Sequence, residues 1–365
     1  MSFEKVGFIG LGLIGGSIAK TIKKKYPDTT LIATARHADT IQEAHDFGTI
    51  ENDTLLPLSD FADCDYIFLC TPVQQNLIYL KKLKSVIKPS CIITDVGSVK
   101  SDIHKAVTAL GMEANFIGGH PMCGSEKTGF FNATEYLLEN AYYIITPTAK
   151  TTPAQLEEFH ALVKSLGSVP MILDYEKHDF ATAAISHLPH IIASSLVNLV
   201  SDLDDEQETM RTIAAGGFKD ITRIASSSPV MWQNICLSNQ EQILKLTDCY
   251  IHALQNIRSS VADAKSDDII SFFQSAKDYR DSITTPVRGS LQKNYSVYCD
   301  LVDEAGAIAT LATIMASHNI SIKNIGILHN REYEDGVLQI EFYEEDALEK
   351  AVKLMEDNHY VVHRR

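Results

Sequence analysis

The sequence predicts an α/β domain with a parallel, doubly wound sheet, then an all-α domain, and finally a second, smaller α/β domain. Three observations support this order. Short β-branched runs alternate with helical stretches as far as Asp174, strand patterns then stop until about Asp281, and a βαββαβ order closes the chain. The expected domains are residues 1–173, 174–288 and 294–365.

The first domain is expected to bury its strands on both faces, because each is a nearly continuous apolar run. The expected strands are Val6–Ile9, Thr30–Ala33, Tyr66–Cys70, Cys91–Asp95, Asn115–Ile117, Tyr142–Thr146 and Val169–Leu173. The expected helices between them are Ile14–Lys25, Val73–Val86, Val99–Leu110 and Pro153–Leu166.

The second domain is expected to be helical, and its helices are apolar enough to need a partner. They are expected at Tyr175–Leu203, Gln207–Ile224, Pro229–Ser259 and Asp267–Asp281. Ser228 is expected to cap the helix that begins at Pro229. Pairing with a second copy of the chain would bury these helices, so a homodimer is expected.

The third domain is expected to have the ferredoxin-like βαββαβ plan. Its strands are expected at Tyr295–Leu301, Ser321–Leu328, Val337–Phe342 and Tyr360–Val362, and its helices at Ala307–His318 and Ala347–Asp357.

Composition excludes several classes of function. A net charge of −15 over 365 residues argues against nucleic acid and anionic membrane surfaces, both of which need a basic face. The seven cysteines never form a CxxC pair, which favours reduced thiols over disulfides or a metal site. No secretion signal opens the chain, and polar residues interrupt the apolar stretch Ile185–Val200. We therefore expect a cytoplasmic protein without a membrane span.

A glycine motif predicts a dinucleotide site. The first strand leads into Gly10-Leu11-Gly12-Leu13-Ile14-Gly15, a GxGxxG between strand and helix. Gly10 permits the tight turn, Gly12 lets the backbone approach a pyrophosphate, and Gly15 lets helix and strand pack closely. The helix N-terminus at Leu13 and Ile14 would bind the phosphates. A glycine-rich packing turn is the alternative, but the context favours a Rossmann domain that binds NAD or NADP.

The second strand does not settle which of the two cofactors binds. The acid that usually holds the adenine ribose is missing, and Ala35-Arg36-His37 stands in its place. Arg36 could pair with a 2′-phosphate, which leans slightly toward NADP, or it could stack over adenine with either cofactor.

Three segments carry residues suited to catalysis: Asp95–Lys100, Gly118–Lys127 and Ser186–His190. His120 lies in a Gly-Gly-His-Pro loop, where an imidazole with a pKa of about 6.5 can accept a proton from a substrate hydroxyl. Ser98 could donate a hydrogen bond to His120 or to the same substrate oxygen.

Substrate-binding candidates follow in the helical domain. Arg223 is the best candidate for a bidentate carboxylate clamp, and Glu126 and Asp220 could orient it. His187 and His190 lie on one helical face, where they could bind substrate or be polar residues of a buried face. No third ligand at a sensible spacing supports a metal site.

Five ordered motifs resemble the prephenate dehydrogenase family of tyrosine biosynthesis. They are Gly10–Ser17, Asp95–Lys100, Gly118–Glu126, Ser186–His190, and Lys219–Ala225 with Pro229–Trp232. The resemblance spans Val6 to about Asp281, and the chain beyond Tyr295 resembles an ACT regulatory domain, with Ala305 where a proline is usual.

The resemblance implies oxidative decarboxylation of prephenate to 4-hydroxyphenylpyruvate and CO2, with hydride passing to NAD(P)+. His120 would accept the ring hydroxyl proton, and Ser98 would support His120 and contact both substrate and nicotinamide. Arg223 would bind a substrate carboxylate near His190 and His187. Glu126 and Asp220 would join its ionic network, Asp220 from the other subunit of a homodimer. Tyrosine would act as feedback inhibitor at the ACT domain.

Three alternatives stay open at this point. Arogenate dehydrogenase differs only in what faces the substrate side chain. β-Hydroxyacid dehydrogenases share the domain order but would not need the Gly-Gly-His-Pro loop. A sensor that binds NAD(P) and an amino acid without turnover would be expected to lack His120, Ser98 or Arg223, and all three are present.

Overall fold

The structure is a computed structural model, and it describes residues 3–124, 127–283, 295–301, 306–328 and 336–363. The chain divides into two compact units, Met1–Ile269 and Ile270–Arg365. The predicted domain ends at residues 288 and 294 lie outside the described residues.

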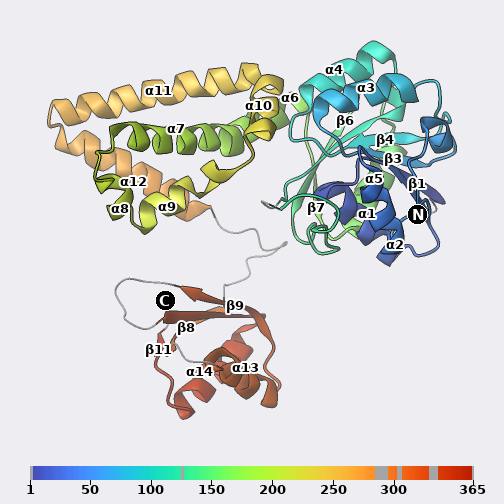
Figure 1. The fold of residues 1–365 in the computed structure, drawn as a ribbon. Coiled ribbons are helices and arrows are strands. Elements are labelled where there is room, and N and C mark those ends of the chain that lie inside the picture. The colour runs from blue at the N-terminus through green and yellow to red at the C-terminus, as the bar shows by residue number, and fades with distance from the viewer. Residues whose placement is uncertain (1–2, 125–126, 284–294, 302–305, 329–335, 364–365) are drawn as a thin grey trace. The chain divides into compact units, whose positions relative to one another are not determined.

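The first unit begins with a twisted sheet (Figure 1). Four parallel strands run in the order β2-β1-β3-β4, namely β2 (Thr30–Thr34), β1 (Lys5–Ile9), β3 (Tyr66–Leu69) and β4 (Ile92–Asp95). Three more run in the order β5 (Ile117–Pro121), β6 (Tyr142–Pro147) and β7 (Val169–Ile172). A parallel bridge between Ile93 and Phe116 joins the two groups.

One strand pair corrects the expectation of an all-parallel sheet. β5 and β6 are antiparallel, whereas β6 and β7 are parallel. A parallel connection needs a crossover of a dozen or more residues, usually a helix. No helix lies among the described residues between β5 and β6, whereas α5 (Pro153–Ser165) makes the crossover from β6 to β7.

Helices cover both faces of the sheet, as predicted (Figure 1). α1 (Leu13–Lys25), α2 (Ala38–Asp46) and α5 contribute to one core, and α3 (Val73–Leu83) and α4 (Ser101–Leu110) to the other. Short 3₁₀ turns lie at Leu58–Phe61 and Glu113–Asn115. Helix α2 was not predicted, because only Ile41 and Ala44 of its nine residues are buried. The chain therefore forms a Rossmann-type domain.

The second part of this unit is helical, with bounds that differ from the predicted ones. Its helices are α6 (Tyr175–Thr182), α7 (Leu188–Leu203), α8 (Thr209–Ile213), α9 (Gly216–Thr222), α10 (Pro229–Ser238) and α11 (Gln240–Ala262), and α12 (Ser266–Ser282) follows. A π-helical turn, Ala183–His187, joins α6 to α7, and a 3₁₀ turn covers Arg223–Ser226. Ser228 caps α10 as predicted, accepting a hydrogen bond from the Met231 amide.

Two predicted helices are interrupted. Gln207–Ile224 breaks into α8, α9 and the 3₁₀ turn, with glycines at the start of α9. Pro229–Ser259 splits at Asn239, whose φ of −118° and ψ of 33° end α10 before α11 begins. The amide side chain of Asn239 is buried and hydrogen-bonded instead to the backbone of α6.

The helical segment leaves many large apolar side chains exposed. On α11 these include Leu244, Ile251, Leu254 and Val261, which recur at helical spacing along one face. By length and composition alone, the continuous stretch Tyr175–Leu203 would also suit a membrane span, as core helices of soluble proteins can. Its first half, however, carries buried His178, Asp179 and His187, which are hydrogen-bonded within the protein.

The second unit confirms the predicted βαββαβ order. After the greater part of α12, its elements are β8 (Tyr295–Leu301), α13 (Ala307–Ser317), β9 (Ile322–Leu328), β10 (Gly336–Phe342), α14 (Glu345–Asp357) and β11 (Val362–His363). The antiparallel sheet order β11-β8-β10-β9 is that of a ferredoxin-like fold. Its core includes Val297, Leu311, Leu338 and Met355, from both strands and helices.

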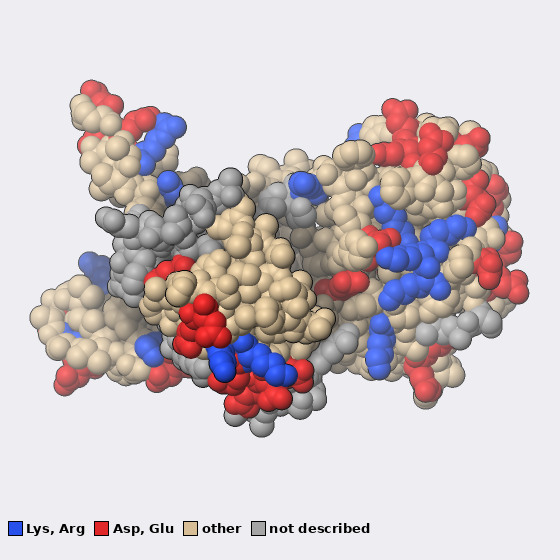
Figure 2. Space-filling model, turned by 90° about the horizontal axis from the view of Figure 1, so that it is seen from below, with Lys and Arg blue, Asp and Glu red and all other residues tan. Residues whose placement is uncertain are grey.

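Charge is unevenly spread on the face of the molecule shown in Figure 2. Lys and Arg side chains gather in one patch, with Asp and Glu side chains around it. Basic residues at the end of α1 are paired with acidic ones, Lys23 with Glu51 and Lys24 with Glu135.

Candidate active site

The sheet brings the sequence motifs to one edge. The glycine motif follows β1, Ser98 follows β4, and His120 lies near the end of β5. Because these three strands are parallel, their carboxyl ends share an edge. The chain runs from β1 outward to β2 and then returns to β3 on the other side, so this edge holds a topological switch point, where open α/β sheets bind ligands.

The glycine loop has the geometry that a dinucleotide requires. Gly10 has a φ of +93°, in the left-handed region, and a Cβ there would lie 2.8 Å from the carbonyl oxygen of Cys70. A Cβ on Gly15 would lie 2.7 Å from the Gly10 carbonyl oxygen. A Cβ on Gly12 would meet no atom within 4 Å, so the space over Gly12 is open.

The first turn of α1 is free to bind an anion. Gly12 provides no side-chain cap, and no acidic residue lies in the first turn, which begins with Leu13 and Ile14. The unpaired N–H groups and the positive end of the helix dipole therefore face the open space over Gly12. Arg36, just beyond β2, is exposed.

A row of three polar side chains was only partly predicted. Nδ1 of His120 lies 2.8 Å from Nε2 of His178, and Nδ1 of His178 lies 2.8 Å from Oδ1 of Asp179. His178 and Asp179 are adjacent residues of α6, whereas His120 belongs to β5. The row therefore joins the helical segment to the Rossmann-type domain.

Asp179 is anchored by the opposite domain. Its Oδ1 accepts the Lys100 amide at 2.8 Å, and its Oδ2 accepts the Ser101 amide at 2.7 Å. Burial alone would raise the pKa of Asp179, but the hydrogen bonds from His178, Ser101 and Lys100 together lower it. The carboxylate is therefore ionised where α4 begins.

Burial also controls the protonation of His120. It lowers the pKa of His120 well below its ordinary value, and the nearby His178, Lys100 and His187 lower it further. His120 is thus unprotonated at neutral pH, which is the state that a proton acceptor needs.

A buried ion pair fixes the backbone beside His120. Nζ of Lys100 contacts Oδ2 of Asp95 and donates to the carbonyl of Gly119 at 2.7 Å, and both charged side chains are fully buried. A Cβ on Gly119 would lie 2.7 Å from the Asp95 carbonyl oxygen and from the Tyr143 hydroxyl. The packing explains why glycine precedes His120, and Ser98 lies half-buried in the loop between Asp95 and Lys100.

The second histidine pair lies beside the single tryptophan. The rings of His190 and Trp232 are stacked, with centroids 3.8 Å apart, and His190 Nδ1–H donates to the Ser186 carbonyl at 2.9 Å. His187 is buried, and its Nδ1 accepts from the Asn239 amide at 3.2 Å. Burial lowers the pKa of His187 to about 4, so this ring is neutral at physiological pH.

The other predicted substrate-binding residues are exposed or lie outside the described residues. Asp220 lies exposed on α9, and Arg223 lies exposed at the start of the 3₁₀ turn that follows. Glu126 lies outside the described residues. Among the described residues, no group of three or more His, Cys, Asp or Glu side chains is arranged to hold a metal ion.

Sequence reasoning missed three residues of this site: His178, Asp179 and Asn239. Lys100 lay within the predicted segment Asp95–Lys100, but no role was given to it. His178 and Asp179 lie in a polar stretch just after the helix cap Asp174, and such stretches are usually exposed. The signal that could have found them is their position directly before an apolar helix that contains a second histidine pair.

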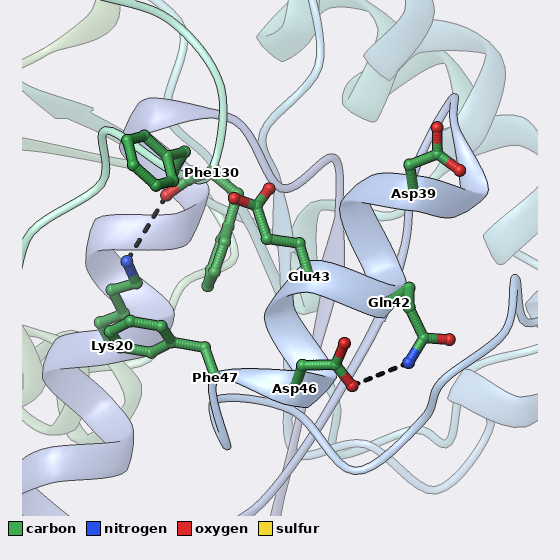
Figure 3. A pocket seen from close by; sticks show the side chains of 8 residues that line it. Lys20, Asp39, Gln42, Glu43, Asp46, Phe47 and Phe130 are labelled. Atoms are coloured by element: carbon green, nitrogen blue, oxygen red, sulfur yellow. Dashed lines mark hydrogen bonds between the residues drawn. The ribbon is translucent and has the colours of Figure 1, made fainter.

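A separate hollow lies away from these residues, between α1, α2 and the chain around Phe130 (Figure 3). Nζ of Lys20 lies 4.1 Å from the ring centroid of Phe47 and 4.3 Å from that of Phe130. The same ammonium donates to the Ala133 carbonyl at 2.8 Å. The lysine therefore holds three elements together.

Comparisons with known proteins agree with this architecture. Family models described as "Prephenate dehydrogenase, nucleotide-binding domain" and "Prephenate dehydrogenase, dimerization domain" match residues 18–172 and 174–275. The prephenate dehydrogenase of Bacillus subtilis is 38% identical over 349 residues, which is 95% of this chain and 94% of that protein.

Two solved structures are also similar. Prephenate dehydrogenase from A. aeolicus, in complex with hydroxyphenyl propionate and NAD+, has a TM-score of 0.73 and 28% identity over 78% of this chain and 99% of its own. Synechocystis arogenate dehydrogenase has a TM-score of 0.69 and 31% identity over 77% of this chain and 100% of its own. On its sequence and its fold, this chain belongs to the prephenate dehydrogenase family.

Proposed function

We propose that this protein converts prephenate to 4-hydroxyphenylpyruvate and CO2 with NAD(P)+, a step of tyrosine biosynthesis. The observation that carries the proposal is the placement of neutral His120 at the sheet edge that also holds the glycine loop. The relatives from B. subtilis and A. aeolicus, both prephenate dehydrogenases, support the choice of substrate.

The residues present fit a dinucleotide. Gly10, Gly12 and Gly15 form the turn, and the uncapped helix at Leu13 and Ile14 would bind the pyrophosphate. When bound, NAD(P)+ supplies the hydride acceptor. Arg36, exposed beyond β2, would face the adenosine end, and its positive charge leans slightly toward the 2′-phosphate of NADP.

His120 would accept a proton from the substrate hydroxyl and later return it. As the ring carbinol carbon of prephenate loses hydride, its hydroxyl becomes strongly acidic, so a base with a lowered pKa suffices. The proton passes to His120, and the C–C bond to the ring carboxylate breaks. Its electron pair enters the ring, which becomes aromatic, and CO2 leaves. The proton then returns to the phenolate oxygen, so His120 ends in its starting state.

Other side chains would hold the substrate. Ser98 would hydrogen-bond near His120, and Arg223 would bind a substrate carboxylate. His190 and His187 would lie along the substrate side chain, while Glu126 and Asp220 would orient Arg223, Asp220 from the partner of a homodimer. The exposed apolar face of α11 supports that pairing.

The C-terminal unit would be regulatory. We propose that residues 294–365 form an ACT domain that binds tyrosine as feedback inhibitor, and its ferredoxin-like strand order supports this. The domains would then be 1–173, 174–288 and 294–365, and the protein would be cytoplasmic.

The experiment is a reduced-cofactor absorbance assay with prephenate or arogenate, each with NAD+ and NADP+, with and without tyrosine. We expect turnover with prephenate and suppression by tyrosine. Turnover with arogenate alone would assign the activity of the Synechocystis relative. Absence of turnover in protein that binds NAD+ would favour a sensor.

A further inference from the structure

In the row Asp179–His178–His120, the position of the hydrogen can be assigned for each hydrogen bond in turn. Backbone N–H groups can only donate. Lys100 and Ser101 donate their amides to the two oxygens of Asp179, and the hydrogen bonds to this side chain lower its pKa, so it accepts as a carboxylate. The bond from Nδ1 of His178 to Oδ1 must therefore have its hydrogen on His178.

The next bond then follows from the chemistry of imidazole. A neutral imidazole has its hydrogen on one nitrogen only, so His178 with Nδ1–H has an unprotonated Nε2. This nitrogen can accept the Nδ1–H of His120 across 2.8 Å. His120 is then left with Nε2 as its only unprotonated nitrogen.

We propose that His178 and Asp179 are positioning residues that hold His120 in its Nδ1–H tautomer, so that Nε2 is the atom that accepts the substrate's proton. This inference rests on the proposed function. The carboxylate would also stabilise the positive charge that His120 gains during the reaction, through two hydrogen bonds.

Burial supports a neutral His120 at the end of the row. The titratable groups around His120 are Asp95 at the end of β4, Lys100 just before α4, Asp179 of α6 and the neutral His187 in the π-helical turn. Lys100 and Asp95 pair with each other, which leaves Asp179 as the counter-charge closest to His178 along the row.

Two substitutions of His178 separate positioning from packing. In His178→Gln, the carboxamide oxygen can still accept from His120 and its N–H2 can donate to Asp179. In His178→Leu, both hydrogen bonds are lost, while the side chain keeps a similar volume. We expect kcat to fall about 100-fold or more in His178→Leu, as for loss of general-base function, and to stay within about tenfold in His178→Gln.

The Michaelis constant for prephenate and the affinity for NAD+ should stay within about twofold in both variants, because His178 is not placed against the ligands. Equal losses in the two variants, or a loss seen only in the Michaelis constant, would overturn the proposal. Circular dichroism of both variants excludes a folding defect as the cause.

A second measurement does not depend on turnover. Histidine 15N shifts of the full-length, NAD+-bound protein distinguish protonated from unprotonated ring nitrogens, and His120→Asn identifies the His120 signals. We expect His120 with Nδ1 protonated and Nε2 unprotonated at neutral pH. The opposite pattern would overturn the inference. If prephenate is not oxidised but the expected pattern is found, the proposed function fails and the tautomer assignment stands.

Discussion

At the residue scale, the glycine motif and His120 were predictable, whereas the side chains that contact His120 were not. His120 was expected in a loop, but it lies on strand β5, where it pairs with Ile144 of β6. His120 and the glycines were found because their neighbours restrict the backbone, and the φ of Gly10 confirms the turn. His178 and Asp179 are adjacent polar residues of a helix, and local sequence cannot show that such residues contact a strand 58 residues earlier in the chain. Long-range hydrogen bonds of this kind arise only from the packing of the two domains.

Two glycines of one loop should respond differently to the same added methyl group. Gly12→Ala should leave the stability of the fold nearly unchanged but weaken NAD+ binding at least tenfold, because its Cβ enters open space. Gly10→Ala should destabilise the protein by about 1 kcal/mol or more, because of its positive φ and the nearby Cys70 carbonyl. Thermal unfolding and NAD+ titration of both variants check this. Equal NAD+ affinity of Gly12→Ala and the parent protein would contradict it.

At the element scale, helix boundaries that are set by capping residues were predicted. Boundaries that are set by tertiary contacts were not. Tyr175–Leu203 is continuously helical, as expected, but a π-helical turn lies before Pro189, where the Leu188 amide donates to the carbonyl of Ala183. Proline has no N–H and crowds the preceding turn, which a wider turn relieves. The break at Asn239 depends on bonds to Asp179 and His187, which no local pattern reveals.

The link between β4 and β5 should depend on the buried Lys100. Replacement by methionine leaves Asp95 without its partner, and breaking a buried ion pair in this way costs about 3–5 kcal/mol. Urea unfolding should show this loss for Lys100→Met. Lys105→Met, at an exposed position on α4, the helix that follows Lys100, is the matched control and should change stability by less than about 0.5 kcal/mol. Equal midpoints for the two variants would contradict the prediction.

At the scale of the whole molecule, the order and type of the three predicted parts could be read from the sequence. Alternating strands and helices, then helices alone, then βαββαβ are patterns of hydrophobic periodicity, which the structure confirms. The antiparallel pairing of β5 with β6 could not be read from the sequence, because strand direction depends on the path of the connection. The apolar character of the helical part predicted a need for burial but not the face that would be buried.

Leu244 and Leu254, which are 55% and 46% exposed on α11, should be buried in the proposed dimer. Replacing both with glutamate would place charges in an apolar interface, so we expect dissociation to monomers in sedimentation velocity. Ile78→Glu, at a position on α3 that is 46% exposed, is the control and should leave the dimer intact. A dimer that survives the double change would place the interface elsewhere.

The anchoring of Asp179 has a consequence for how such proteins can be recombined. The two family models meet between residues 172 and 174, while the groups that orient His120 lie just beyond that junction. A dinucleotide-binding half exchanged at the junction could carry its cofactor site into a new protein, yet it would leave behind His178 and Asp179. We therefore expect a chimaera joined there to bind nucleotide without turnover, and the two halves to be inherited as a single catalytic module.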